Sequence, residues 1–115
     1  GDDARVIAAL SNAAKDQLVE VAQAAIMALA RVTLPGNERT VSIARDCLAH
    51  KDSWMRRTAA EALGMVASKG DMLSTRALSM RCTEDTDPEV VLQAIGSLGS
   101  VAQQGDAAAS AALCA

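Results

Sequence analysis

Apolar residues recur with a helical period over residues 52–66, which read DSWMRRTAAEALGMV. They fall at i, i+4, i+7, i+8 and i+11, and are Met55, Ala59, Ala62, Leu63 and Val66. This spacing places them on one face of an α-helix. The same stripe occurs twice more, as Val21, Ala25, Ala28, Leu29 and Val32, and as Val90, Ala94, Ser97, Leu98 and Val101. The pattern predicts one amphipathic helix written three times.

Glycines mark the boundaries of this repeat. Gly1, Gly36, Gly70 and Gly105 are 35, 34 and 35 residues apart, and each is followed by Asp or Asn. Glycine is favoured where a helix ends in a left-handed turn. Asp or Asn is a good N-cap for the helix that follows. The glycines therefore predict tight turns between repeats of about 1–35, 36–69 and 70–104, with a partial repeat over 105–115.

Each repeat is predicted to hold two helices, here named the first and the second helix. The expected pairs are 3–14 with 17–33, 38–49 with 53–68, and 72–82 with 88–103. Asp87-Pro88 is a strong start signal, because Asp caps the helix and proline at the first helical position loses no hydrogen bond. A further helix over 107–115 would begin a fourth repeat, so we expect the chain to be a fragment of a longer array.

The composition suits helices that pack closely. Half of the residues are hydrophobic, but there is no Phe or Tyr, one Trp and only two prolines. Small side chains let helix axes approach one another, and Ala and Leu are strong helix formers. The sequence therefore predicts an all-α protein.

Two segments resemble HEAT repeats, whose second helix follows the pattern Asp-x-Asp-Pro-x-Val-Arg, then Ala, then Ala-Leu-Gly. The segments are His50–Arg56 with Ala59 and Ala62–Gly64, and Asp85–Val91 with Ala94 and Ser97–Gly99. The first repeat is less similar, since we find neither the acidic turn nor the arginine in it. The resemblance implies a right-handed α-α superhelix (α-solenoid) of about three HEAT-type hairpins plus the start of a fourth, with the second helices on the concave side.

The same resemblance implies a non-catalytic protein–protein interaction or scaffolding module. Two alternatives stay open, namely a structural subunit of a large assembly and a fragment of a HEAT-like bilin lyase. His50 is the only histidine, so no catalytic group and no metal or cofactor site is expected. The three cysteines show no paired spacing. We therefore expect no enzyme and no cofactor.

Charge and hydropathy limit the classes of partner that the chain is expected to bind. The net charge of −3, with a pI near 5.0, argues against a nucleic-acid-binding face, and no run of apolar residues is long enough to span a membrane. Another protein is thus the expected partner. Without a signal-peptide pattern we expect an intracellular, cytoplasmic protein, with an organelle as the alternative.

The resemblance also assigns a structural pair. HEAT repeats carry an arginine at the position of Arg56, where it bonds an acidic turn residue of a neighbouring repeat. In this chain the partner would be Asp85 or the adjacent Asp87. Arg57 lies one step round the helix and is expected to face solvent.

Trp54 is the candidate contact with a partner. It holds the place of Glu20 in the first repeat and Glu89 in the third, so it should be exposed at the edge of the helix turns. The indole either lies over the aliphatic stem of Lys51 or Arg57, or anchors a partner together with Arg57 and His50. Tryptophan and arginine dominate the energetics of many interfaces. An apolar or acidic partner surface would fit, and it would meet the ridge of turns within the hairpins rather than the concave side.

The C-terminal stretch suggests a covered end. Residues 107–115 are Ala, Ser, Leu and Cys, and no charge follows Asp106. A capping repeat needs a polar outer face. We therefore expect this end to continue into further repeats or to pack on another chain.

Overall fold

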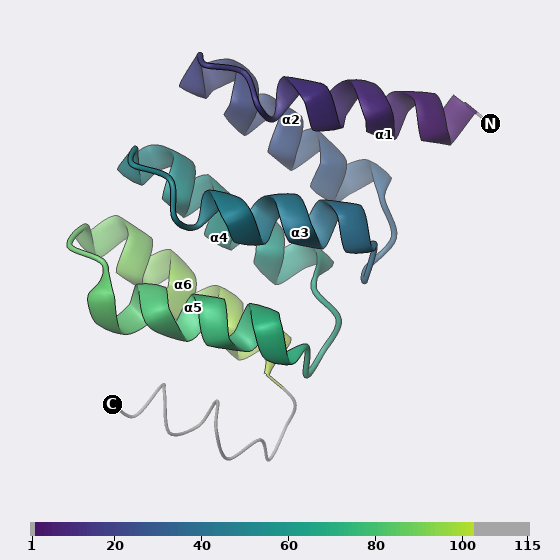
Figure 1. Ribbon diagram of the computed structural model, residues 1–115. Helices are drawn as coiled ribbons and strands as arrows, with labels where there is room; N and C mark the ends of the chain where they lie inside the picture. The colour runs from purple at the N-terminus through teal and green to yellow at the C-terminus, as the bar shows by residue number, and fades with distance from the viewer. Residues whose placement is uncertain (1, 103–115) are drawn as a thin grey trace.

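The computed structural model describes residues 2–102, which form six helices and no strand. In chain order they are α1 (Asp2–Ala13), α2 (Val19–Val32), α3 (Glu38–Cys47), α4 (Ser53–Val66), α5 (Met72–Glu84) and α6 (Pro88–Val101). The hairpins α1–α2, α3–α4 and α5–α6 stack one below the other (Figure 1). The predicted all-α fold of stacked hairpins is therefore confirmed. The helix expected over 107–115 lies outside the described residues.

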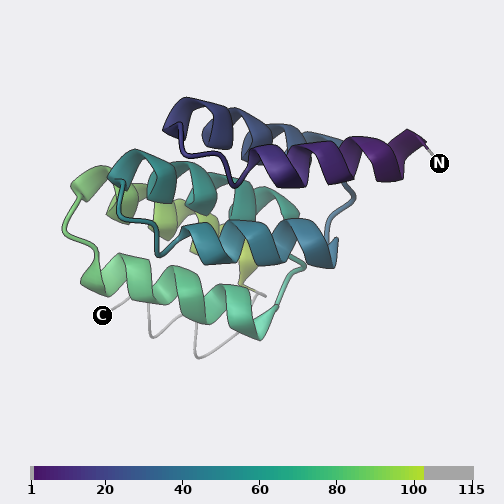
Figure 2. The ribbon, with the colours of Figure 1, turned by 45° about the horizontal axis from the view of Figure 1, so that its top comes forward.

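The hairpins arrange their helices in two layers. The first helices, α1, α3 and α5, lie side by side in one layer, and the second helices, α2, α4 and α6, form the other (Figure 2). In the second layer α4 packs along both α2 and α6, whereas α3 and α5 touch at only a few places. The second helices therefore pack against one another more closely than the first helices do.

Side-chain caps set where α3, α4 and α6 begin. Asn37 accepts the N–H of Thr40 at 3.1 Å, and Asp52 accepts the N–H groups of Trp54 and Met55. Pro88 opens α6 as predicted. These caps satisfy N–H groups that have no partner within the helix.

Two glycines serve the turns between hairpins. Gly36 and Gly70 have φ values of 88° and 81°, in the left-handed region that favours glycine. The N–H of Gly36 donates to the carbonyl of Val66 at 2.5 Å, and that of Gly70 donates to the carbonyl of Val101 at 2.7 Å. Each glycine thus ties its turn to the last turn of the next second helix, which links one repeat to the following one.

The predicted stripe forms the core of the second and third hairpins. Leu29, Leu63 and Leu98 are fully buried, as expected from their shared place in the repeat. The remaining stripe residues of α4 and α6 are buried as well: Met55, Ala59, Ala62, Val66, Val90, Ala94, Ser97 and Val101. Repeat period and burial therefore agree in these two hairpins.

In α2 the predicted stripe is partly wrong. Val21 and Val32 are 39% and 54% exposed, and Ala28 is only half-buried. The helix instead buries Ile26 and Ala30, on the face where Gln23 donates to Thr58 Oγ1 of α4 at 2.9 Å. Within the described residues α2 has a second helix on one side only, so its other flank faces solvent.

We predict that Leu63→Ala lowers the free energy of unfolding by about 2–5 kcal/mol, because it leaves a cavity between the layers. Met65→Ala is the matched control, since Met65 lies two residues away and is exposed. Urea unfolding followed by circular dichroism measures both variants. Equal midpoints for the two variants would contradict the assignment of Leu63 to the core.

Candidate functional site

A charged cluster joins the turn of the second hairpin to that of the third. Arg56 grips Asp85 with two hydrogen bonds, from Nε to Oδ2 at 2.8 Å and from Nη2 to Oδ1 at 3.1 Å. Its Nη1 donates to the carbonyl oxygens of His50 and Lys51 at 2.9 and 3.0 Å. One guanidinium therefore holds its own turn and the next turn together, in the bidentate geometry that arginine favours.

Asp85 is the centre of this cluster. Its side chain is only 1% exposed, and Arg81, one helical turn earlier, donates to Oδ2 at 3.2 Å. The backbone N–H of Asp87 donates to Oδ1 at 2.9 Å. Burial raises the pKa of Asp85, but the hydrogen bonds from Arg56 and Asp87 and the charges of both arginines outweigh it, so the pKa lies below its ordinary value.

Asp87 has a different task from Asp85. Its carboxylate accepts the N–H of Glu89 at 2.8 Å and thereby caps α6. Of the two candidate acids, Asp85 accepts the side-chain hydrogen bonds of Arg56, and Asp87 does not. Arg81 was missed in the sequence, although its i, i+4 spacing from Asp85 is a known signal for a helical ion pair.

The same hydrogen bond closes all three turns within hairpins. Asp16, His50 and Asp85 each accept the backbone N–H of the residue two positions later, at 2.8, 3.0 and 2.9 Å. His50 does so through Nδ1. The first repeat therefore does have an acidic turn residue, Asp16, which corrects the interpretation of the sequence.

At each of the two described junctions between hairpins, the arginine of one hairpin and the acid in the turn of the next are either both present or both absent. Ala22 stands in α2 where α4 has Arg56, and the turn it faces carries His50 where the next turn carries Asp85. A lone buried charge in either place would be strongly destabilising. The first junction is therefore neutral at this point and the second is ionic.

Trp54 and Arg57 lie on the outward surface of the second helices. Trp54 is 65% exposed, and it shares its face of α4 with exposed Glu61 and Met65, seven and eleven residues later. Arg57 follows one turn after Trp54 and is also exposed. Half-buried His50 lies in the preceding turn with Nδ1 engaged by the backbone. The structure thus brings Trp54 and Arg57 to one surface, while His50 serves the turn.

The second helices α2, α4 and α6 together expose one face that points away from the first helices. We name this face the inner surface. Its residues are Glu20, Ala24, Met27, Arg31, Trp54, Arg57, Glu61, Met65, Glu89, Gly96 and Ser100. Between α4 and α6 it carries a shallow groove of about 290 Å³ that Gly64, Met65, Gly96 and Ser97 help to line. The small residues Gly64, Gly96 and Ser97 leave this groove open.

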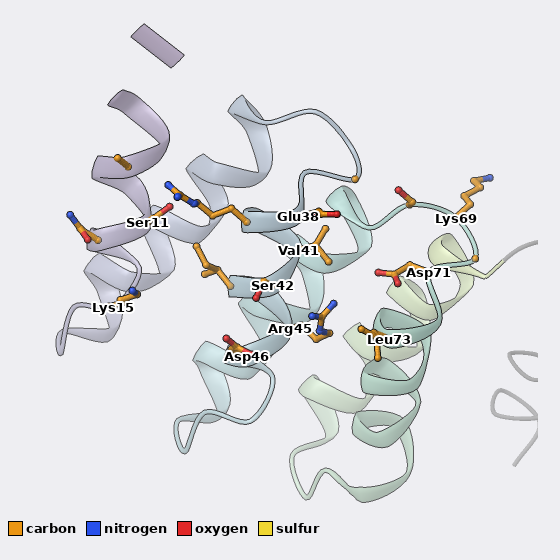
Figure 3. Close-up of a pocket in the computed structure, with 17 residues that line it drawn as sticks. Ser11, Lys15, Glu38, Val41, Ser42, Arg45, Asp46, Lys69, Asp71 and Leu73 are labelled. Atoms are coloured by element: carbon orange, nitrogen blue, oxygen red, sulfur yellow. The ribbon is translucent and has the colours of Figure 1, made fainter. Parts of the chain in front are cut away.

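A larger groove opens on the opposite layer. It has a volume of about 1120 Å³ and lies along α1, α3 and the start of α5, where the first helices stand apart (Figure 3). Its charged lining has both signs, from Lys15, Glu38, Arg39, Arg45, Asp46, Lys69 and Asp71. A lining of mixed charge marks no single class of ligand.

The described residues offer little for catalysis. They contain no group of three or more His, Cys, Asp or Glu side chains placed to hold a metal ion. Burial raises the pKa of the Cys47 and Cys82 thiols, and nearby Asp46 raises that of Cys47 further, so both are poor nucleophiles. None of the described helices combines the length and the apolarity needed to cross a membrane.

We predict that Arg56→Met lowers the free energy of unfolding by about 2–4 kcal/mol, because Asp85 stays buried without its bidentate partner. The double variant Arg56→Ala with Asp85→His copies the Ala22–His50 junction and should lose less than the two single changes summed. Chemical unfolding of the parent, Arg56→Ala, Asp85→His and the double variant gives this double-mutant cycle. Strict additivity would show that the pair is not coupled.

A second prediction concerns pH. Because the folded-state pKa of Asp85 is lowered, its contribution to stability is complete above about pH 4 and is lost as pH falls through the folded-state pKa. The stability difference between the parent and Asp85→Asn should therefore shrink in acid. Asp16→Asn, at the exposed equivalent turn, is the control for replacing a turn carboxylate that is not buried. A constant gap for Asp85→Asn would contradict the ionic role.

Comparison with known proteins agrees with this geometry. The family described as HEAT repeats matches residues 6–99, whereas no curated protein and no solved structure matches the chain. HEAT repeats generally mediate protein–protein interaction and generally act as non-catalytic scaffolds. Since the match covers most of the sequence and the described helices form stacked hairpins, this chain belongs to the HEAT repeat family.

Proposed function

We propose that this chain is a non-catalytic interaction module that binds another protein on its inner surface, with Trp54 as the anchor. The observation that carries the proposal is the 65% exposure of Trp54, the only aromatic side chain in the sequence. At the equivalent places α2 and α6 carry Glu20 and Glu89, so the repeat does not itself require an indole there.

The anchor is large enough to matter energetically. A tryptophan side chain buries about 150–250 Å² in an interface, and at about 25 cal/mol per Å² its exposed part supports roughly 2–4 kcal/mol. Arg57, one turn further along α4, can add charge-assisted hydrogen bonds at the edge of the same contact. These two residue types dominate the energetics of protein interfaces.

The neighbouring side chains define the partner's surface. Met65, beyond exposed Glu61 on the same face of α4, offers a second apolar point of contact, which favours apolar groups on the partner. Arg57 and Lys51 favour acidic groups beside that pocket. Glu20 and Glu89 flank Trp54 on the adjacent helices and would repel further acidic groups there. A partner with an apolar pocket and a localised acidic rim fits best.

His50 supports the site indirectly. Its imidazole accepts the N–H of Asp52, and Asp52 in turn caps the first turn of α4, which contains Trp54. Gln23 of α2 donates to the carbonyl of Trp54 at 3.4 Å. The backbone beneath the indole is therefore held from both sides, which lowers the entropy lost on binding.

The test is Trp54→Glu, which introduces the residue that α2 and α6 already carry at this place. Met72→Glu is the matched control, because Met72 is similarly exposed at the start of α5 in the other layer. Proteins captured by the parent are identified by mass spectrometry, and the affinity of the recovered partner is then measured by calorimetry.

We expect Trp54→Glu to weaken the partner at least about thirtyfold, equivalent to about 2 kcal/mol, with melting temperatures within about a degree of the parent. Met72→Glu should bind as the parent does. If Trp54→Glu retains the affinity of the parent, the anchor is wrongly assigned.

A further inference from the structure

The turn within the second hairpin is closed by an imidazole, whereas the other two turns within hairpins are closed by carboxylates. Asp16 and Asp85 each accept a backbone N–H with a carboxylate oxygen. His50 accepts the N–H of Asp52 with Nδ1 at 3.0 Å. Because a backbone N–H can only donate, Nδ1 must offer a lone pair to it. The bond therefore requires an imidazole that carries no proton at Nδ1.

Mild acid acts differently on these three turns. A protonated imidazole carries a hydrogen on both ring nitrogens, so Nδ1 has no lone pair left to accept a hydrogen bond. Histidine side chains gain this proton between about pH 8 and pH 5, whereas aspartate side chains stay charged down to about pH 4. Between these limits the turn bond of His50 is lost, and the bonds of Asp16 and Asp85 remain.

The first junction offers the protonated ring no new partner on α2. At the second junction Arg56 reaches across and holds the turn residue Asp85 with two hydrogen bonds. In the equivalent place of α2, facing the turn of His50, stands Ala22, which is buried and has no polar side-chain atom. Once His50 is charged, the residue of α2 that faces its turn therefore cannot hold the ring in place.

Charged groups of the same hairpin do not replace the lost bond. The carboxylate of Asp52 already caps α4, and Asp46, one turn earlier along α3, is exposed to water. Lys51 is exposed as well, and Arg56 donates from Nη1 to the carbonyl oxygen of His50 at 2.9 Å. The two cations repel an imidazolium, so charge within this hairpin favours movement of the protonated ring away from the turn.

The acids of the neighbouring hairpins are screened or already bonded. Water and salt screen the exposed charges in the first turn and at the start of α2, which are Lys15, Asp16 and Glu20. In the third hairpin Asp85 is bound by Arg56 and Arg81, and Asp87 caps α6. Because the pKa of Asp85 is lowered, its carboxylate stays charged and bound to Arg56 while His50 titrates.

Asp52 connects the imidazole to the indole. Its N–H donates to His50, and its Oδ1 accepts the N–H groups of Trp54 and Met55 at 2.8 and 3.2 Å. These bonds form one chain from the ring of His50 to the first turn of α4. When the first bond of the chain is lost, the backbone of Asp52 is free to turn, and the cap beneath Trp54 loses its support.

We propose that His50 is a pH-sensitive switch, which holds the turn beneath Trp54 closed at neutral pH and releases it when the imidazole is protonated. Released in this way, the indole becomes more mobile while the rest of the fold stays intact. A partner held by Trp54 would then bind more weakly in mild acid, and this consequence alone rests on the function proposed above.

The experiment is an NMR titration of the ¹⁵N-labelled 115-residue chain from about pH 7.5 to about pH 5.5, the range in which histidine titrates. His50 is the only histidine, so its ring signals give the protonation curve without overlap. We expect the amide proton of Asp52 to shift upfield with the same midpoint, because its hydrogen bond is lost. The amides of Leu18 and Asp87, bonded to carboxylates in the equivalent turns, are internal controls and should not follow that midpoint.

Trp54 provides the second measurement. It is the only tryptophan, so time-resolved fluorescence anisotropy reports the nanosecond motion of this one indole. We expect the fast component of the decay to grow as the pH falls in the parent. His50→Asn is the matched control, because its side-chain oxygen accepts the N–H of Asp52 and does not titrate. Its anisotropy decay should be the same at both ends of the range.

Two results would overturn the proposal. One is an amide proton of Asp52 that keeps its position while the ring of His50 titrates. The other is an equal growth of the fast anisotropy component in the parent and in His50→Asn. Either result leaves Trp54 as the proposed anchor untouched, whereas an unchanged affinity of Trp54→Glu would reject the anchor and leave the switch standing.

Discussion

Small side chains at the contacts between second helices set the geometry of this protein. Gly64 has no side chain, so Ser97 can lie against the backbone of α4, and Ala30 and Ala60 are buried along the same row. Short side chains bring helix axes close together. The first helices α1, α3 and α5 lie further from one another than the second helices do. The groove along α1, α3 and the start of α5 follows from that difference.

Polar contacts at the two edges of the stack fix its register. At one edge Gly36 and Gly70 donate to the carbonyl oxygens of Val66 and Val101. At the other edge Arg56 joins two turns through buried Asp85. Apolar stripes alone could slide past one another, because the hydrophobic effect is not directional. Hydrogen bonds with fixed donors and acceptors remove that freedom.

The two junctions between hairpins are chemically different. The first relies on the neutral bond from Gln23 to Thr58, and the second adds the ionic cluster around Asp85. Acid that protonates Asp85 therefore acts on the second junction only. Trp54 lies on α4, the helix shared by both junctions, so a protein bound at Trp54 would contact the most firmly held part of the stack.

Periodicity and cap chemistry in the sequence determined the helices, the hairpin turns and the burial of Leu29, Leu63 and Leu98, because these depend on neighbours along the chain. The ionic partner of Arg56 was open between two acids until the fold placed Asp85 beneath it and Arg81 beside it. The exposure of Val21 and Val32, the turn role of His50 and the position of Trp54 on the inner surface came only from the tertiary structure. Each of these depends on which helix covers which flank, and a pattern that recurs in every repeat does not encode that difference between repeats.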